Sequence, residues 1–417
     1  MSVERADLVI LGAGLSGASL ALRLTDPAFE ALRIVVVEPR AEPAAERTWC
    51  WWRLRDESTI DDVLGPPRHA WSAIEFVGPG GGRLRRTPSA PYVCLPGTEF
   101  YARVSPRLTA CDHVELRRGV AARQVTESAD AVRVTLQGAR GTTVLEAPLV
   151  FDARPPAAAP ADPQPRLVQS FLGWDVETED AVFDPSCATL MDFAAVDGVA
   201  EDGVAEGGFA DRARHAARAA HFLYVLPFGP RRALVESTWF GRRAVHGDVD
   251  AEILRRWLNA RAGDRWRLLR SEHGVLPMDA RLAPPPGARR VVPLGIRGGA
   301  LRPSSGYGFA RVQQASDLLA HQLRTRLAAD RPLAPLTAPR LDGLGDRWMD
   351  RVFLARLGRR PETAPELFEH LFAACPIDRL VRFLAGTARA ADRLAVIRAL
   401  PAAPLAREAV REVLRAA

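Results

Sequence analysis

Three glycines near the start of the chain have the spacing of a nucleotide-binding turn. Gly12, Gly14 and Gly17 follow the apolar run LVIL and precede a stretch rich in alanine and leucine. Glycine at the first position permits a sharp turn, at the second it leaves room for a pyrophosphate, and at the third it permits close packing of a helix. We therefore predict that these glycines, with Ala13 between them, bind a dinucleotide cofactor.

An acidic residue completes this pattern. Glu38 ends a second apolar run, IVVVE, and lies about 20 residues beyond the last glycine, where an acid accepts hydrogen bonds from a ribose diol. The ligand phosphates would lie at the free N–H groups and the positive end of the intervening helix. An acid here disfavours a phosphate on the same ribose, so the sequence indicates FAD or NAD in preference to NADP.

The composition is typical of a globular protein with a large core. The chain has 417 residues, of which 47% are hydrophobic and 25% charged, enough for two or three domains. It contains no apolar run of about 18 residues and no signal peptide pattern, so we expect a cytoplasmic protein.

The five cysteines form no CxxC pair and the eight histidines do not cluster, so neither disulfides nor a metal site are expected. All 56 basic residues are arginine, which excludes a Walker A lysine and Schiff-base catalysis.

The region beyond Pro339 has a helical pattern and an excess of positive charge. Residues 340–417 contain 14 arginines and 10 acidic residues. Helices with arginine and apolar faces can rest on anionic lipid headgroups, although a solvated helical surface explains the pattern equally well. No basic run is interleaved with aromatic residues as base stacking requires, so nucleic-acid binding is not predicted.

The middle of the chain predicts a second unit and then a return to the first. Alternating segments between Val114 and Phe151 predict a small antiparallel sheet. A proline- and alanine-rich segment over 155–165 then precedes a series of short strand patterns. A strand over 290–293, a glycine-rich turn and an amphipathic helix ending near Leu327 then resemble a nucleotide-binding pattern again. The predicted divisions are a discontinuous FAD-binding domain over 1–155 and 280–330, a strand-rich substrate domain over 166–279 and a helical region over 331–417.

The order of motifs over nearly the whole chain resembles one family, the bacterial lycopene β-cyclases, FAD proteins that close rings on linear carotenoids. The stretches that carry the resemblance are LGAGLSGASLA, RTWCWW, FDARP, QSFLGWDV, ATLMDF, HFLYVLPFGPRRALVEST, EHGVLPM, GIRGGALRPSSGYGF, RWMDRVFLARL and FLAGTARAADRL. The departures are Pro155, where a glycine is common, and a long insertion over 196–208.

The resemblance implies an α/β fold similar to that of the aromatic hydroxylases, with a Rossmann-type FAD-binding domain, a strand-rich substrate domain and a C-terminal helical segment. The implied reaction converts lycopene to γ-carotene and β-carotene without net redox change, with reduced FAD as cofactor and NAD(P)H as its reductant. It also implies peripheral attachment to a membrane surface and contact with other enzymes of carotenoid synthesis. Gly298, Gly299 and Gly306 are expected near the flavin, and Arg154 either there or paired with Asp152.

Ring closure of a polyene needs a proton donor in a dry pocket. Glu236 is the candidate acid and base, because the family places its essential glutamate in this motif and burial would raise its pKa. Judged from the residues alone, a solvent-facing carboxylate or a partner for Arg231 or Arg232 is the more frequent role. Asp192 is the second candidate, with a strand-end or turn cap as its alternative role.

Aromatic faces can stabilise a carbocation through their quadrupoles. The residues proposed for the substrate pocket are Trp49, Trp51, Trp174, Phe193, Tyr224 and Trp239, although each could instead fill the core. Two other functions stay open at this point. One is an FAD-dependent monooxygenase or isoprenoid reductase on the same fold, and the other is a flavin- and carotenoid-binding protein without catalysis.

Overall fold

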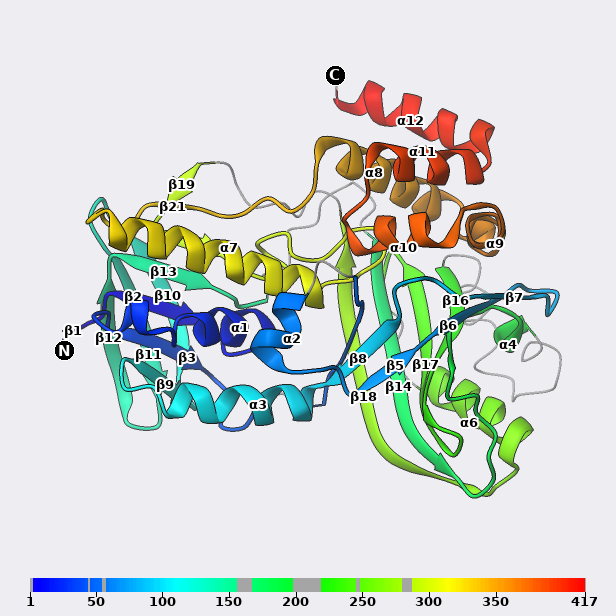
Figure 1. Cartoon of the computed structure of the whole chain (residues 1–417), viewed down its shortest axis with the longest axis horizontal. Helices are drawn as coiled ribbons and strands as arrows, with labels where there is room; N and C mark the ends of the chain where they lie inside the picture. Colours follow the sequence, from blue (N-terminus) through cyan, green and yellow to red (C-terminus); the bar gives the residue numbers. More distant parts are fainter. Residues whose placement is uncertain are drawn as a thin grey trace.

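A parallel sheet and a larger mixed sheet lie side by side, and the C-terminal helices lie against the mixed sheet (Figure 1). The computed structural model describes residues 3–43, 46–54, 58–155, 167–197, 219–244, 248–279 and 287–416. The expected linker over 155–165 and the insertion over 196–208 lie almost entirely outside these residues.

A five-stranded parallel sheet forms the nucleotide-binding fold. Its order is β20 (Val291–Pro293), β13 (Leu149–Asp152), β2 (Leu8–Leu11), β3 (Ile34–Glu38) and β9 (Val114–Arg118). All residues of β2 and β13 are buried, which explains why these strands read as continuous apolar runs. On one face the core consists of side chains from α1 (Leu15–Arg23), α3 (Gly97–Thr109) and α7 (Phe309–Ala328).

A four-stranded sheet covers the other face of the parallel sheet. Its order is β1 (Val3–Arg5), β12 (Gly141–Ala147), β11 (Val132–Gly138) and β10 (Ala121–Glu127). The alternating patterns over 132–147 predicted this antiparallel pairing, which is confirmed. The strand at Val114 was expected in the same small sheet, but it pairs in parallel with β3 instead.

The seven-stranded mixed sheet contains the strands expected for a substrate domain. Its order is β18 (Trp266–Met278), β14 (Leu167–Thr178), β17 (Arg232–Gly241), β16 (Ala219–Gly229), β15 (Cys187–Asp192), β6 (Ala73–Val77) and β7 (Arg83–Arg86). Helix α6 (Asp248–Ala262) packs on one face. Strands β6 and β7 come from residues that the sequence-based division placed with the nucleotide-binding part. Four of the five side chains of β6 are buried, as expected for a strand within a sheet and beneath a helical layer.

A three-stranded sheet lies between the two larger ones. It has the order β4 (Thr48–Trp52), β8 (Tyr92–Pro96) and β5 (His69–Trp71). The remaining short elements are α2 (Ser58–Leu64), α4 (Ala194–Asp197), η1 (Pro27–Phe29), η4 (Pro361–Thr363), β19 (Ala288–Arg289) and β21 (Leu336–Thr337).

The C-terminal part is helical, as predicted. It consists of α8 (Leu344–Arg359), α9 (Ala364–Ala374), α10 (Ile377–Ala385), α11 (Ala390–Ala399) and α12 (Ala402–Ala416). Phe372 of α9 stacks on Phe76 of the mixed sheet with ring centroids 5.3 Å apart, so the helices share a core with that sheet. Within the described part of the chain, no helix has both the length and the apolar content needed to cross a bilayer.

Candidate active site

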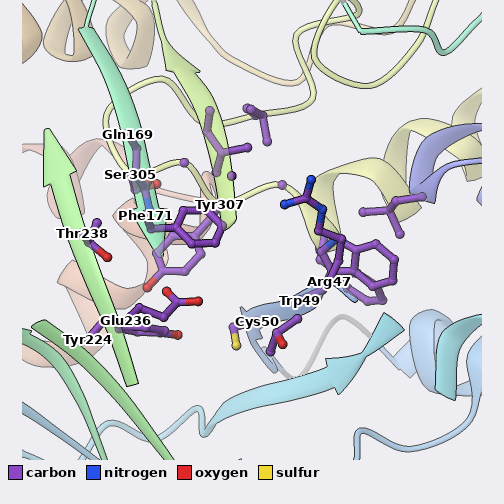
Figure 2. Close-up of a pocket in the computed structure, with 18 of the residues that line it drawn as sticks. Arg47, Trp49, Cys50, Gln169, Phe171, Tyr224, Glu236, Thr238, Ser305 and Tyr307 are labelled. Atoms are coloured by element: carbon purple, nitrogen blue, oxygen red, sulfur yellow. The ribbon is translucent and has the colours of Figure 1, made fainter. Parts of the chain in front are cut away.

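A cavity of about 590 Å³ lies where the two large sheets and the C-terminal helices meet. The start of α1, the mixed sheet, the segment from Ala300 to Phe309 and helices α9 and α10 all contribute to its wall. Figure 2 shows Glu236 and Tyr224 on one side of this cavity and Arg47 and Trp49 on the other. The cavity therefore joins the glycine-rich turn before α1 to an apolar chamber.

The nucleotide end is formed by two helix starts. Gly14 is the N-cap of α1 and Gly308 is the N-cap of α7, both line the cavity, and neither helix start has a side-chain cap. A Cβ atom on Gly14 would have no protein atom within 4 Å, so a ligand can approach the backbone there. Free N–H groups at two helix starts beside an open glycine fit the pyrophosphate of a dinucleotide.

The other residues of the first motif shape this turn from behind the cavity wall. A Cβ atom on Gly17 would lie 1.8 Å from the Gly12 carbonyl oxygen, so only glycine allows α1 to pack this closely. Gly12 has φ +95°, which also favours glycine. The Glu38 carboxylate accepts hydrogen bonds from the N–H of Ala13 (2.7 Å) and of Arg40 (3.1 Å), which holds it beside the turn.

The second glycine motif contributes one of its three predicted residues to the cavity wall. Gly306 lines the cavity with φ +72°, whereas Gly298 and Gly299 form the turn behind it. Arg154 also lines the cavity and is paired with Asp152, with 2.8 Å between Nη2 and Oδ2. The pairing is thus one of the two roles expected for Arg154, and its position at the cavity wall is compatible with the other.

Glu236 projects into the cavity beside a second glutamate. In the sheet register, Gly173 of β14 is opposite Glu236 of β17 on one side and Glu272 of β18 on the other. A Cβ atom on Gly173 would lie 2.9 Å from Cγ of Glu236 and 3.2 Å from Cγ of Glu272. The glycine therefore provides the space in which the two carboxyl groups approach each other.

The surroundings favour the protonated form of Glu236. Its side chain is 7% exposed, and burial followed by the negative charge of Glu272 raises the pKa of Glu236 well above its ordinary value. Glu272 is anchored by Arg270 Nη1 and by Thr48 Oγ1, each 2.9 Å from Oε2. A carboxyl group that keeps its proton beside an ion-paired carboxyl group, within an apolar cavity, is suited to donate a proton.

Two of the six predicted aromatic residues line the cavity, and they are Trp49 and Tyr224. Tyr224 is opposite Glu236 in the register of β16 and β17, and its hydroxyl lies 2.9 Å from that of Tyr92. Phe171 and Tyr307, which the sequence analysis did not select, also line the chamber. Aromatic faces therefore surround the carboxyl pair.

The other four aromatic residues belong to the core. Trp174 directly follows Gly173 in its strand, and Trp239 is three residues from Glu236, so both point to the opposite face of the sheet. Trp239 donates a hydrogen bond to Asp250 (2.7 Å), and Trp174 stacks on Trp266. The remaining two are also buried in core clusters, Trp51 stacked on Phe309 and Phe193 beside Phe76.

Asp192 does not reach the cavity. Its Oδ1 accepts the N–H of Ala195 (2.9 Å) and so caps α4, which is the alternative role considered from the sequence. The carboxyl partner of Glu236 is Glu272, which the sequence analysis did not select. Its only sequence signal is the motif EHGVLPM, because the register that brings it to Gly173 is not visible in the sequence.

The chain is similar in sequence to known proteins over nearly its whole length. The profile of the lycopene cyclase protein family matches residues 7–410. The lycopene beta-cyclase of Paracoccus sp. is 27% identical over 96% of this chain and 95% of its own length. The lycopene beta-cyclase of Pantoea ananas is 25% identical over 96% of both chains.

Solved structures show the same fold at lower identity. A geranylgeranyl bacteriochlorophyll reductase-like protein from Thermoplasma acidophilum superposes with a TM-score of 0.61 at 13% identity, covering 99% of this chain and 100% of that one. The flavin-dependent monooxygenase PieE, solved with FAD and substrate, gives 0.56 at 15% identity, covering 99% and 71%. The fold is therefore that of FAD-dependent reductases and monooxygenases, with a C-terminal helical segment.

Proposed function

The chain belongs to the lycopene cyclase protein family, and from this we propose that it is a lycopene β-cyclase. It would convert the linear ends of lycopene into β-rings by acid–base catalysis without net oxidation or reduction. The observation that carries the proposal is the buried pair of Glu236 and Glu272 in a cavity that begins at a nucleotide-binding turn. The lycopene beta-cyclases of Paracoccus and Pantoea, similar over 95% and 96% of their length, support it.

We propose FAD as the cofactor, because the cavity fits a dinucleotide. The open backbone at Gly14 and the uncapped starts of α1 and α7 would hold it, with Glu38 at its ribose. When bound in the reduced form, with NAD(P)H as external reductant, the flavin would supply negative charge beside a developing carbocation. The positive end of α7 favours an anionic ring at this place.

The protein side chains would then perform the proton transfers. Glu236 donates its proton to the terminal alkene, which leaves a tertiary carbocation on the substrate and a carboxylate on Glu236. The neighbouring double bond attacks this carbocation to close the ring, and the Glu236 carboxylate takes up a ring proton. One proton enters and one leaves, so the product has the mass of the substrate and the acid is regenerated.

The cavity wall has the properties that this reaction needs. Tyr224 and Phe171 present aromatic faces to the region of positive charge. Phe368 and Leu371 of α9 line the chamber with apolar surface and exclude water that would quench a carbocation. The substrate is a hydrocarbon from a lipid phase, so we also propose a cytoplasmic protein that contacts a membrane surface, near other enzymes of carotenoid synthesis.

A redox enzyme is the second candidate, because the solved proteins of the same fold include a reductase-like protein and a monooxygenase. Expression in a lycopene-accumulating bacterium, followed by mass spectrometry of the pigments, separates the two functions. We expect a ringed product with the mass of lycopene. Added oxygen or hydrogen in the product would contradict the proposal, and unchanged lycopene would favour a binding protein without catalysis.

A further inference from the structure

Helix α12 buries its two glutamates and exposes several apolar side chains. Glu408 and Glu412 are 2% and 7% exposed, and both form ion pairs with arginines of α8. The exposed apolar side chains of the same helix are Val410 (59%), Val413 (55%) and Leu414 (73%). A surface helix normally has the opposite arrangement, so this apolar stripe indicates a contact outside the chain.

A second cavity, of about 230 Å³, lies between the end of α8 and the start of α12. Its wall consists of Arg356, Arg359, Arg360, Pro404, Arg407, Glu408 and Arg411. Five guanidinium groups thus surround it with a single carboxylate, and that carboxylate is already shared by Arg359 and Arg411. We refer to this cavity as the arginine pocket.

Two cations of the arginine pocket lack a partner. Among the residues that the structure describes, Arg356 and Arg407 form no ion pair, and Nε of Arg356 is buried without a hydrogen-bond partner. Unpaired guanidinium groups that converge on a small cavity repel one another unless an anion lies between them. Their planar sets of N–H donors match phosphate oxygens in particular.

The arginine pocket and the apolar stripe adjoin on α12. Arg407 precedes Val410 by three residues and Arg411 precedes Leu414 by three, so each arginine neighbours an exposed apolar side chain on the helix surface. Figure 1 shows α12 at the outer edge of the helical layer, where both features can meet an external surface. Basic groups beside an apolar stripe are typical of a helix that lies in a membrane interface.

We propose that the arginine pocket binds the phosphate of an anionic phospholipid headgroup while Val410, Val413 and Leu414 enter the adjoining acyl region. Three side chains on a convex helix are too few for a stable protein interface, which buries about 800 Å² per partner. A lipid surface, in contrast, needs only a short apolar stripe and nearby positive charge. The inference rests on the membrane contact proposed above and gives that contact a defined surface.

The test uses the full-length, flavin-loaded protein and carotenoid-free vesicles in a flotation assay. The variant R356Q/R407Q removes the two unpaired charges and so breaks no ion pair. We expect roughly tenfold or more weaker binding to vesicles of phosphatidylcholine with phosphatidylglycerol, and unchanged weak binding to phosphatidylcholine alone. The matched control R123Q/R140Q removes the same charge from the four-stranded sheet and should bind like the wild type.

A second variant tests the apolar stripe. V410S/L414S should weaken binding to both kinds of vesicle, because it removes the side chains that insert. If V410S/L414S bound vesicles like the wild type, the pocket would be an anion site without lipid docking, and the proposal would be overturned. Equal effects of R356Q/R407Q and of its control R123Q/R140Q would also overturn it. Binding by the wild type that does not weaken as salt is raised would overturn it without any variant. Ring formation, assayed separately in detergent micelles, tests the cyclase proposal independently of vesicle binding.

Discussion

Gly173 decides what two neighbouring side chains can do. Because it has no Cβ, the side chains of Glu236 and Glu272 can fold over the central strand and meet. Glu272 is anchored by Arg270 and Thr48, whereas burial and the acidic neighbour raise the pKa of Glu236. This asymmetry is the reason for proposing Glu236, and not Glu272, as the proton donor.

The first prediction concerns this donor. E236Q should slow ring formation by about 10²- to 10⁴-fold, because the amide cannot supply a proton. The fold and the flavin content should stay unchanged, since Gln has the same shape and its N–H can donate to Glu272. The measurement is the rate of product formation with reduced flavin, together with flavin absorbance.

D192N provides the matched control, because it makes the same chemical change in a buried aspartate outside the cavity. Asparagine also caps helices well, so both activity and stability should stay close to the wild type. A slow D192N enzyme together with a normal E236Q enzyme would show that the acid has been assigned to the wrong residue.

The second prediction concerns the pH dependence of stability. The pKa of Glu236 is raised in the folded state. At a pH between the unfolded and the folded pKa, the folded protein therefore keeps a proton that the unfolded chain has lost. The wild type should therefore lose stability relative to E236Q as the pH rises above the unfolded pKa of 4.5, by up to about 1.4 kcal/mol per pH unit until the folded pKa is passed. Unfolding midpoints of both proteins across this pH range provide the measurement, and a constant difference would contradict burial of the acid.

Single residues of the site could be predicted where a motif or a spacing marks them. Gly14 and Glu236 are of this kind, and both lie where the sequence analysis expected. Glu272 and Gly173 could not be predicted, because only strand register brings them together. Trp239 and Trp174 were selected as aromatic candidates. Successive side chains of a strand point to opposite faces of the sheet, so these two face away from the acid.

At the scale of elements, the two glycines Gly17 and Gly14 at the start of α1 have different roles: the first allows close packing and the second leaves room for a ligand. The third prediction compares G17A with G14A. A Cβ atom at Gly17 collides with the Gly12 carbonyl, so G17A should lose about 3 kcal/mol or more of unfolding free energy. A Cβ atom at Gly14 meets open space, so G14A should keep its stability but lose flavin affinity, because the methyl group occupies the approach of the pyrophosphate.

Chemical unfolding and the ratio of flavin to protein absorbance test this pair. G14A that retains full flavin, or G17A as stable as the wild type, would contradict the role given to each glycine. Both variants change one hydrogen to one methyl group at sites three residues apart, so each serves as the control for the other.

Elements were predictable where a pattern is long or carries glycine signals. Helix α7 and the helical C-terminal part follow the 3.6-residue pattern and were expected. Strands β6 and β7 are short, and the pairing of β6 with β15 across more than 100 residues has no local signal. The same limit applies to β9, whose alternating residues suited either of two sheets.

At the scale of the molecule, the cavity requires that the C-terminal helices stay attached to the nucleotide-binding part. Arg302 and Asp350, both 0% exposed, form the connection, with 3.2 Å between Nη2 and Oδ1. Ser304 donates a second hydrogen bond to Asp350 (2.6 Å), and Arg302 lies over the Phe383 ring of α10. Because Ser304 also lines the cavity, this buried pair ties the shape of the chamber to the position of α8.

The fourth prediction is that D350N uncouples these parts. The substitution removes the nearer of the two carboxylates that pair with the buried Arg302 and leaves Asp346, 3.7 Å away and shared with Arg393, which should cost about 3 kcal/mol of unfolding free energy. The segment after Arg302 should then lose its fixed position, so flavin retention and ring formation should fall together. As a control, E177Q removes the partner of Arg267 in a surface ion pair, 41% and 73% exposed, and should cost less than about 1 kcal/mol. If D350N had the same unfolding free energy as E177Q and kept its flavin, this would contradict the prediction. Apolar contacts such as that of Phe372 with Phe76 would then be sufficient to hold the chamber closed.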